Sequence, residues 1–193
     1  MLKKSLFFIL FLTAISGAIL LIQWISYEKV SRAYQEWQLD QEIHLEHNHT
    51  GLSIKHTFIG LEAGQPLSVI LPASALNAAC KKKEGNCSFR GQGALITPDG
   101  ETLTISYALK MPPLGSSFVL SDWFIKLKDA KAENTTLHFT EKKIRTGMWF
   151  SSLGTAEIKK LDLIDYYMFQ GSGSPGELYW QQEPLKQASF HSK

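Results

Sequence analysis

Four of the six histidines lie close together in the sequence, and their imidazole nitrogens are potential ligands for a transition metal such as Zn²⁺ or Cu²⁺. The four are His44, His47, His49 and His56. On a hairpin that turns near Thr50 and Gly51, residues 47 and 49 share one strand face and residue 56 returns beside them. The cluster therefore raises the hypothesis of an extracytoplasmic metal-binding protein. Because no H-E-x-x-H or comparable motif accompanies it, histidines on a polar strand edge are the preferred interpretation.

Aromatic side chains flank the glycine- and serine-rich loop at 171–176 and are candidates for a ligand platform. Neighbouring strand residues point to opposite faces, so we expect one member of each adjacent aromatic pair at the surface. An exposed Tyr or Trp offers a flat apolar body with a polar tip, which suits a sugar ring or a protein partner. The platform residues are Tyr167, Phe169, Tyr179 and Trp180. The alternative is that a second layer of the fold covers this face as well.

Cys80 and Cys87 are the two cysteines of the chain, and they bracket a short lysine-rich segment. In an exported domain both thiols meet an oxidising compartment, so we expect a disulfide bond that closes a tight loop. The pair is not a C-x-x-C redox motif. A structural zinc site needs four ligands, which two cysteines alone do not supply.

Catalytic motifs are weak throughout the sequence. Ser26-Tyr-Glu-Lys29 matches S-x-x-K, but Ser26 ends the apolar N-terminal segment and the β-rich pattern lacks the context of serine acyl-enzymes. Acid pairs such as Asp162 with Asp165 occur on any solvated surface, and a sequence cannot supply the separation that a glycosidase requires. We therefore expect no enzymatic activity and no cofactor.

The elements that must position these side chains are strands. Between residues 43 and 183 apolar and polar residues alternate, and turn residues such as Pro98-Asp99-Gly100 separate the runs. About ten strands at short, even spacing predict an all-β ectodomain, a jelly-roll-like β-sandwich. The predicted strand segments are 43–45, 52–58, 67–71, 89–96, 102–109, 118–127, 135–139, 144–150, 156–167 and 178–180.

Three further segments have distinct sequence patterns, two of them within the domain and one after it. The clearest alternation runs from Asp122 to Asp129, with Trp123 and Ile125 on the face predicted to be buried. Residues 71–79, rich in alanine, resemble a short helix. The polar stretch 184–193 lacks periodicity and is expected to form a flexible tail.

An uncharged segment precedes the domain. Residues 5–25 contain no charged side chain across 21 positions, which at about 1.5 Å per residue spans roughly 30 Å of hydrocarbon. With Lys3 and Lys4 in a cytoplasmic end at 1–4, the positive-inside rule predicts a single-pass anchor in the cell membrane and an extracytoplasmic C-terminal domain. A signal peptide cleaved after Ala18 is the alternative, although the apolar run continues to Ile22.

The residues between anchor and domain, 26–42, are predicted to form a juxtamembrane helical stalk. Tyr27, Val30, Tyr34 and Trp37 recur at spacings of three and four and so share one helix face.

Charge and composition narrow the function. Apart from Lys3 and Lys4, 18 basic side chains balance 18 acidic ones, which argues against nucleic acid as a partner. The excess of lysine over arginine favours a bacterial source. We therefore expect a membrane-anchored binding module, an accessory or regulatory subunit that docks on another protein of the cell envelope. A module that binds cell-wall glycan is the alternative.

Overall fold

The computed structural model describes residues 13–26, 37–48, 51–81, 87, 89–111, 117–142 and 147–182. The chain divides into two compact units, Met1–Glu36 and Trp37–Lys193. In the first unit the described residues form one α-helix over 13–26. Within the described ranges, no helix combines the length and the apolar character that a membrane crossing requires. Part of the predicted anchor (5–12), most of the predicted stalk (27–36) and the predicted tail lie outside the described residues.

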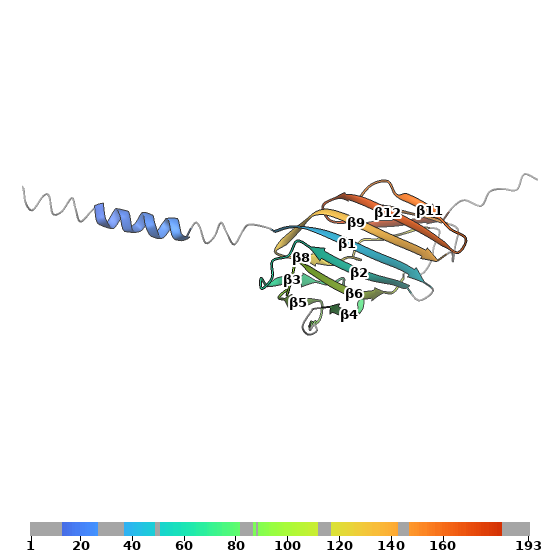
Figure 1. Cartoon of the computed structure of the whole chain (residues 1–193), viewed down its shortest axis with the longest axis horizontal. Coiled ribbons are helices and arrows are strands. Elements are labelled where there is room, and N and C mark those ends of the chain that lie inside the picture. Colours follow the sequence, from blue (N-terminus) through green and yellow to red (C-terminus); the bar gives the residue numbers. More distant parts are fainter. Residues whose placement is uncertain are drawn as a thin grey trace, which may run out of the picture. The chain divides into compact units, whose positions relative to one another are not determined.

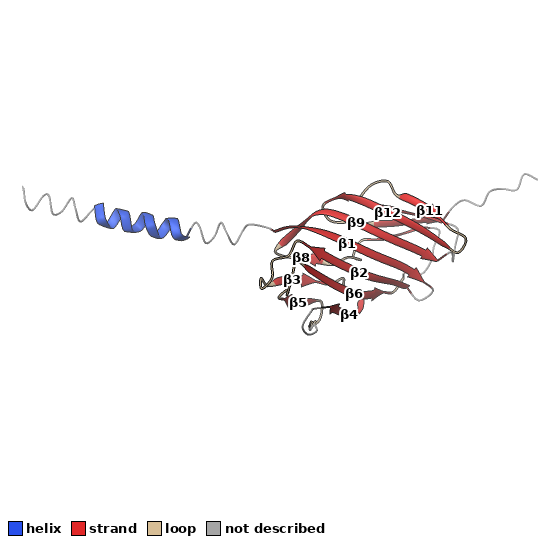
Figure 2. Ribbon diagram, viewed as in Figure 1, coloured by secondary structure: helices blue, strands red, loops and turns tan. Residues whose placement is uncertain are grey.

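The described residues of the second unit form strands joined by loops and turns (Figure 2). The strands are β1 (Trp37–Asn48), β2 (Gly51–Ile59), β3 (Leu67–Ile70), β4 (Ala75–Lys81), β5 (Gly93–Ile96), β6 (Thr102–Leu109), β7 (Ser117–Leu120), β8 (Lys126–Leu127), β9 (Ala130–Lys142), β10 (Gly147–Ser151), β11 (Glu157–Lys160), β12 (Ile164–Ser172) and β13 (Leu178–Gln182).

One large sheet organises this unit. Its seven strands have the order β11-β12-β9-β1-β2-β6-β4 (Figure 1). Neighbours run antiparallel except for β1 and β9, which pair in parallel at the centre of the sheet. A jelly roll is an antiparallel architecture of two Greek keys, so this parallel pair departs from the jelly-roll-like topology that the sequence suggested.

Alternation along the central strands separates a buried face from a wet face. Every second side chain of β1 from Leu39 to His47 is buried, and β2 repeats the pattern from Leu52 to Phe58. The side chains between them are exposed or half-buried and mostly polar. Because successive strand residues point to opposite sides, this period fixes which residues enter the core.

A second layer covers the buried face. It consists of two three-stranded sheets, β10-β13-β7 and β5-β3-β8. The ring of Phe139 in β9 packs on that of Trp149 in β10, with ring centroids 4.4 Å apart. The hydroxyl of Tyr107 in β6 donates a hydrogen bond to the carbonyl of Trp123 at 2.9 Å. These contacts between layers confirm the predicted all-β sandwich.

The predicted helix at 71–79 is wrong, because residues 75–81 form β4. This strand pairs antiparallel with β6, and its register shifts between Leu76 and Ala79. Asn77 adopts a positive φ of 54° at that irregularity. Helix propensity is a weak preference, and hydrogen bonding to an open sheet edge outweighs it here.

The helical stalk does not extend to residue 42, because β1 begins at Trp37. From Trp37 onward the strand pairs with β9, starting opposite Ala130. The alternation of buried residues already starts at Leu39. The sequence analysis missed this start of the strand because Trp37 also fits the three- and four-residue spacing of a helix.

The single strand predicted over 118–127 is also wrong. It is divided into β7 and β8, and the segment between them is irregular. Trp123, Phe124 and Ile125 are all buried, which consecutive residues of a strand against one core layer cannot be. The indole Nε1–H of Trp123 donates to the carbonyl of Gly176 at 2.8 Å and holds the segment inside the sandwich.

Candidate functional site

His47 and His56, two of the predicted metal ligands, lie on the buried face of the large sheet, and each makes a different polar contact. His47 stands directly opposite Glu141 in the β1–β9 register, and its Nδ1 lies 2.8 Å from both carboxylate oxygens. The Nε1–H of Trp149 donates to the same carboxylate at 2.8 Å. All three side chains are buried, so this trio links the two layers of the sandwich.

His56 belongs to a second buried contact. Its Nε2 lies 2.8 Å from Oε1 of Gln41, whose amide in turn donates to the hydroxyl of Thr135 at 2.7 Å. The Nδ1 atom of His56 is buried without a hydrogen-bond partner. Burial lowers the pKa of His56 to about 3, because a low-dielectric surrounding disfavours the imidazolium form.

The structure does not bring the three described histidines of the predicted metal site, His44, His47 and His56, together. His44 is exposed on the opposite face of the sheet from the buried His47 and His56. His49 lies outside the described residues. The cause is the period of the strand: positions 44 and 47 differ by an odd number, so their side chains must point to opposite faces.

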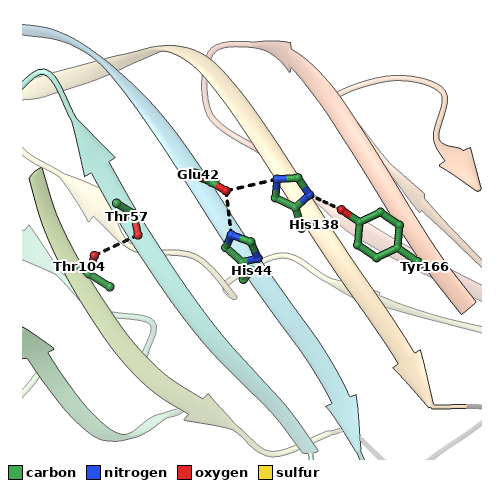
Figure 3. A network of polar contacts seen from close by, with 6 residues as sticks. All are labelled: Glu42, His44, Thr57, Thr104, His138 and Tyr166. Atoms are coloured by element: carbon green, nitrogen blue, oxygen red, sulfur yellow. Dashed lines mark hydrogen bonds and ion pairs between the residues drawn. The ribbon is translucent and has the colours of Figure 1, made fainter. Parts of the chain in front are cut away.

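On the outer face, His44 instead meets residues that the sequence analysis did not select (Figure 3). Its Nε2 lies 2.7 Å from Oε1 of Glu42, and Nε2 of His138 lies 3.3 Å from the same oxygen. Nδ1 of His138 is hydrogen-bonded to the hydroxyl of Tyr166. We call Glu42, His44, His138 and Tyr166 the outer polar cluster. It draws on three adjacent strands, β1, β9 and β12.

The surroundings of the outer polar cluster favour a neutral imidazole. Burial lowers the pKa of His138, the neighbouring His44 lowers it further, and Glu42 opposes both effects. A depression of about 240 Å³ adjoins the cluster, and its lining includes Glu46, Lys55 and Thr140. The cluster therefore lies at an open, polar hollow of the sheet surface.

The predicted aromatic platform does not exist as one surface. Tyr167, Phe169 and Trp180 are buried, and Tyr179 alone of the four is exposed. The rings of Tyr167 and Phe169 stack inside the sandwich, and that of Trp180 stacks on Phe118. The rings of Tyr167 and Phe169 on the large sheet and that of Trp180 on the small sheet β10-β13-β7 are thus enclosed between the two layers, which is the alternative that the sequence left open.

Tyr179 instead belongs to a row of apolar side chains on the outer face of the small sheet β10-β13-β7. Phe150 and Val119 stand directly opposite it on the two neighbouring strands. Val119, Tyr179 and Phe150 are 50%, 41% and 45% exposed. We call these three residues the apolar row. The adjacent aromatic pair Trp149-Phe150 was the available signal for Phe150, since one of the two must face outward.

The predicted disulfide is present. Cys80 of β4 is bonded to Cys87, and their Cα atoms are 5.5 Å apart. Cys80 is buried opposite Ile105 of β6, so the bond ties Cys87 to the edge of the large sheet.

Comparisons with known proteins inform the fold. No family model matches the sequence, and no curated protein matches it. Among solved structures, the chain resembles an M1 zinc metallopeptidase from Deinococcus radiodurans, with a TM-score of 0.51, 14% identity and 75% of this chain covered. An E323A mutant of such an enzyme from the same organism, bound to a Tyr-Ser-Ala substrate, gives a TM-score of 0.50 at 13% identity.

A two-domain M1 zinc metallopeptidase mutant bound to L-tryptophan is similar, with a TM-score of 0.51 at 15% identity and 73% of this chain covered. The chain spans 41% to 42% of the length of these three peptidases. At such low identity the likeness shows a shared fold alone.

Proposed function

We propose that this protein is a membrane-anchored, extracytoplasmic binding module that docks on another protein of a bacterial cell envelope as an accessory or regulatory subunit. The observation that carries the proposal is the apolar row. Val119, Tyr179 and Phe150 are cross-strand neighbours that expose apolar surface across all three strands of the small sheet. Adjacent exposed apolar side chains can mark an interaction surface, and aromatic side chains are enriched in the buried centres of protein interfaces.

The edges of the large sheet are less suited to docking. β11 exposes all four of its residues, among them Glu157, Lys159 and Lys160. Charged side chains on an edge strand oppose the addition of another strand. At the other edge, the irregular register of β4 interrupts the row of backbone donors and acceptors. A partner that avoids both edges must bind a face of a sheet through side chains, and the apolar row provides such a surface.

A protein fits the apolar row better than a glycan. Val119 is aliphatic, and Met148, on the same face as Phe150, is half-buried beside it. A sugar needs hydroxyl partners on either side of a stacked ring, whereas methyl and thioether groups match the apolar centre of a protein interface. The glycan alternative retains one favourable observation, the exposed ring of Tyr179.

The sequence at the N-terminus supports membrane anchoring. Residues 5–25 carry no charge, and in the helix at 13–26 large apolar side chains such as Leu20, Ile22 and Trp24 are exposed. Lipid is the solvent in which such exposure is favourable.

A site-specific crosslink tests the proposal. A photoreactive benzoyl-phenylalanine replaces Tyr179 in the full-length chain, and irradiation of native membranes is followed by mass spectrometry. We expect one envelope protein to be crosslinked, and the yield to fall at least fivefold when Phe150→Glu places a charge in the apolar row. The same probe at Ser106, exposed on the outer face of β6, is the matched control.

Equal crosslinking from positions 179 and 106, or none from 179, contradicts docking through the apolar row. Sedimentation of the full-length chain with purified cell-wall polymer decides the alternative. If the chain sediments with the polymer and Tyr179→Ala abolishes this binding, the apolar row would be assigned to glycan recognition instead of protein docking.

A further inference from the structure

The two histidines of the outer polar cluster are held against each other by the backbone. His44 and His138 are direct partners in the parallel register of β1 and β9. Their rings stack with centroids 4.6 Å apart and planes 19° from parallel. Glu42 precedes His44 by two residues and therefore shares its face. Since both strands lie inside the sheet and not at an edge, the three side chains are brought together before any ligand binds.

The donor atoms converge on one point. One ligand atom from each of Glu42, His44 and His138 lies within 4.8 Å of the other two. Both Nε2 atoms approach the same carboxylate oxygen, at 2.7 Å and 3.3 Å. In a tetrahedral zinc site with bonds of about 2.0–2.2 Å, ligand atoms are about 3.4 Å apart. Small side-chain rotations therefore suffice to admit an ion.

The second nitrogen of His138 has the partner that a metal ligand requires. Tyr166 is hydrogen-bonded to Nδ1 and so fixes the orientation of the ring while Nε2 faces Glu42. Metal-binding histidines almost always engage their other nitrogen in this way.

The two imidazole nitrogens and the carboxylate oxygen lie around one point. A divalent cation satisfies both nitrogens and the carboxylate together. Two imidazoles and one carboxylate are a donor set of Zn²⁺ and related transition metals, whereas Mg²⁺ and Ca²⁺ prefer oxygen ligands.

We propose that Glu42, His44 and His138 bind a divalent transition metal ion of the Zn²⁺ type on the outer face of the large sheet, with Tyr166 as the residue that positions His138. Three protein ligands leave a coordination position open toward the solvent and the adjoining hollow. The site is separate from the apolar row, which lies on the small sheet, so it adds to the proposed docking function and does not depend on it.

Calorimetric titration with Zn²⁺ tests the site in the full-length chain, purified without a tag in mild detergent and stripped with a chelator. We expect one ion per chain, bound in the micromolar range. His44→Ala and His138→Ala should each weaken binding at least tenfold, and Tyr166→Phe should weaken it about tenfold, as is usual for residues that orient a ligand. His191→Ala is the control for adventitious binding by imidazole and should change nothing.

A second readout separates loss of the site from loss of the fold. Saturating Zn²⁺ should raise the unfolding temperature of the unmodified chain and leave that of the His44→Ala/His138→Ala variant unchanged, while circular dichroism reports the same strand content for both. Unchanged affinity in the double variant would overturn the proposal. So would the absence of binding at 100-fold the expected dissociation constant, or equal weakening by His191→Ala.

Discussion

Nδ1 of His47 lies 2.8 Å from both carboxylate oxygens of Glu141, a residue 94 positions further along the chain. The contact joins β1 to β9 on the buried side of the large sheet. Trp149 of the small sheet donates to the same carboxylate. A carboxylate buried in this way is stable only while its partners remain, because an unpaired buried polar group keeps its full desolvation cost.

Replacement of Glu141 by alanine should therefore be strongly destabilising. Leaving a buried donor or acceptor without its partner costs about 1–3 kcal/mol for each group, and here the change removes the partner of both His47 and Trp149. Urea unfolding of the full-length chain, followed by tryptophan fluorescence, measures the loss. Glu141→Gln keeps an acceptor for Trp149 and should cost less than the alanine variant; equal stability of Glu141→Ala and the unmodified chain would contradict the assigned role.

The sequence predicted the class of fold because strand period and turn residues are local signals. Alternation over residues 52–58 and 102–109 corresponds to β2 and β6, in which alternate side chains are buried. The segments that it assigned wrongly are those where tertiary contacts outweigh local pattern. Within the predicted helix, residues 75–79 belong to strand β4 because β6 offers an edge, and Trp123 is buried in a loop through its bond to Gly176.

The outer polar cluster could not be predicted from the sequence, because it too depends on tertiary contacts. His44 was selected, but its partner His138 becomes a neighbour only through the parallel pairing of β1 and β9. Parallel neighbours are joined by a long connection, so sequence distance gives no hint of their register. The prediction of an aromatic platform was wrong because alternation shows which residues share a face of a strand. It does not show which of the two faces a second layer covers.

Loss of the disulfide should weaken the domain by a predictable amount. The chain-entropy estimate for a loop of eight residues is about 2.5 kcal/mol at 25 °C, and Cys80→Ala/Cys87→Ala should lower the free energy of unfolding by about that much. A reductant should destabilise the unmodified chain comparably and leave the double variant unaffected. Two thiols that alkylate freely in exported protein, detected by intact mass, would show that the bond does not form in the cell.

Gly51 should tolerate no side chain. Its φ is +146°, and a Cβ added there would lie 2.2 Å from the backbone carbonyl oxygen of Leu109 on the neighbouring β6. Backbone atoms of a paired strand cannot move aside cheaply, so Gly51→Ala should cost about 3 kcal/mol or more. At Gly100 an added Cβ meets no heavy atom within 4 Å, and Gly100→Ala should stay within about 0.5 kcal/mol of the unmodified chain. Similar unfolding midpoints for the two variants would refute the steric argument.

Protonation of His56 should make the domain sensitive to mild acid. Its folded-state pKa is lowered from 6.5 to about 3, so between these two pH values the unfolded chain binds a proton at this side chain that the folded chain does not. The free energy of unfolding therefore falls as pH decreases, by about 1.4 kcal/mol per pH unit from this residue once pH is well below 6.5. Above pH 6.5 His56 is neutral in both the folded and the unfolded chain, so its protonation does not lower the free energy of unfolding there.

His56→Gln isolates this contribution, because glutamine retains a polar contact with Gln41 and does not titrate. The variant should be less stable than the unmodified chain at pH 7.5, since the buried packing of His56 against Phe58 is altered. Between pH 6 and pH 4 the free energy of unfolding of the variant should fall less steeply than that of the unmodified chain. The two slopes should differ by about 1.4 kcal/mol per pH unit, the contribution of one proton. Carboxylates common to both chains contribute equally to the two profiles and cancel in the difference. Parallel profiles over this range would mean that His56 takes up a proton without leaving its buried contact.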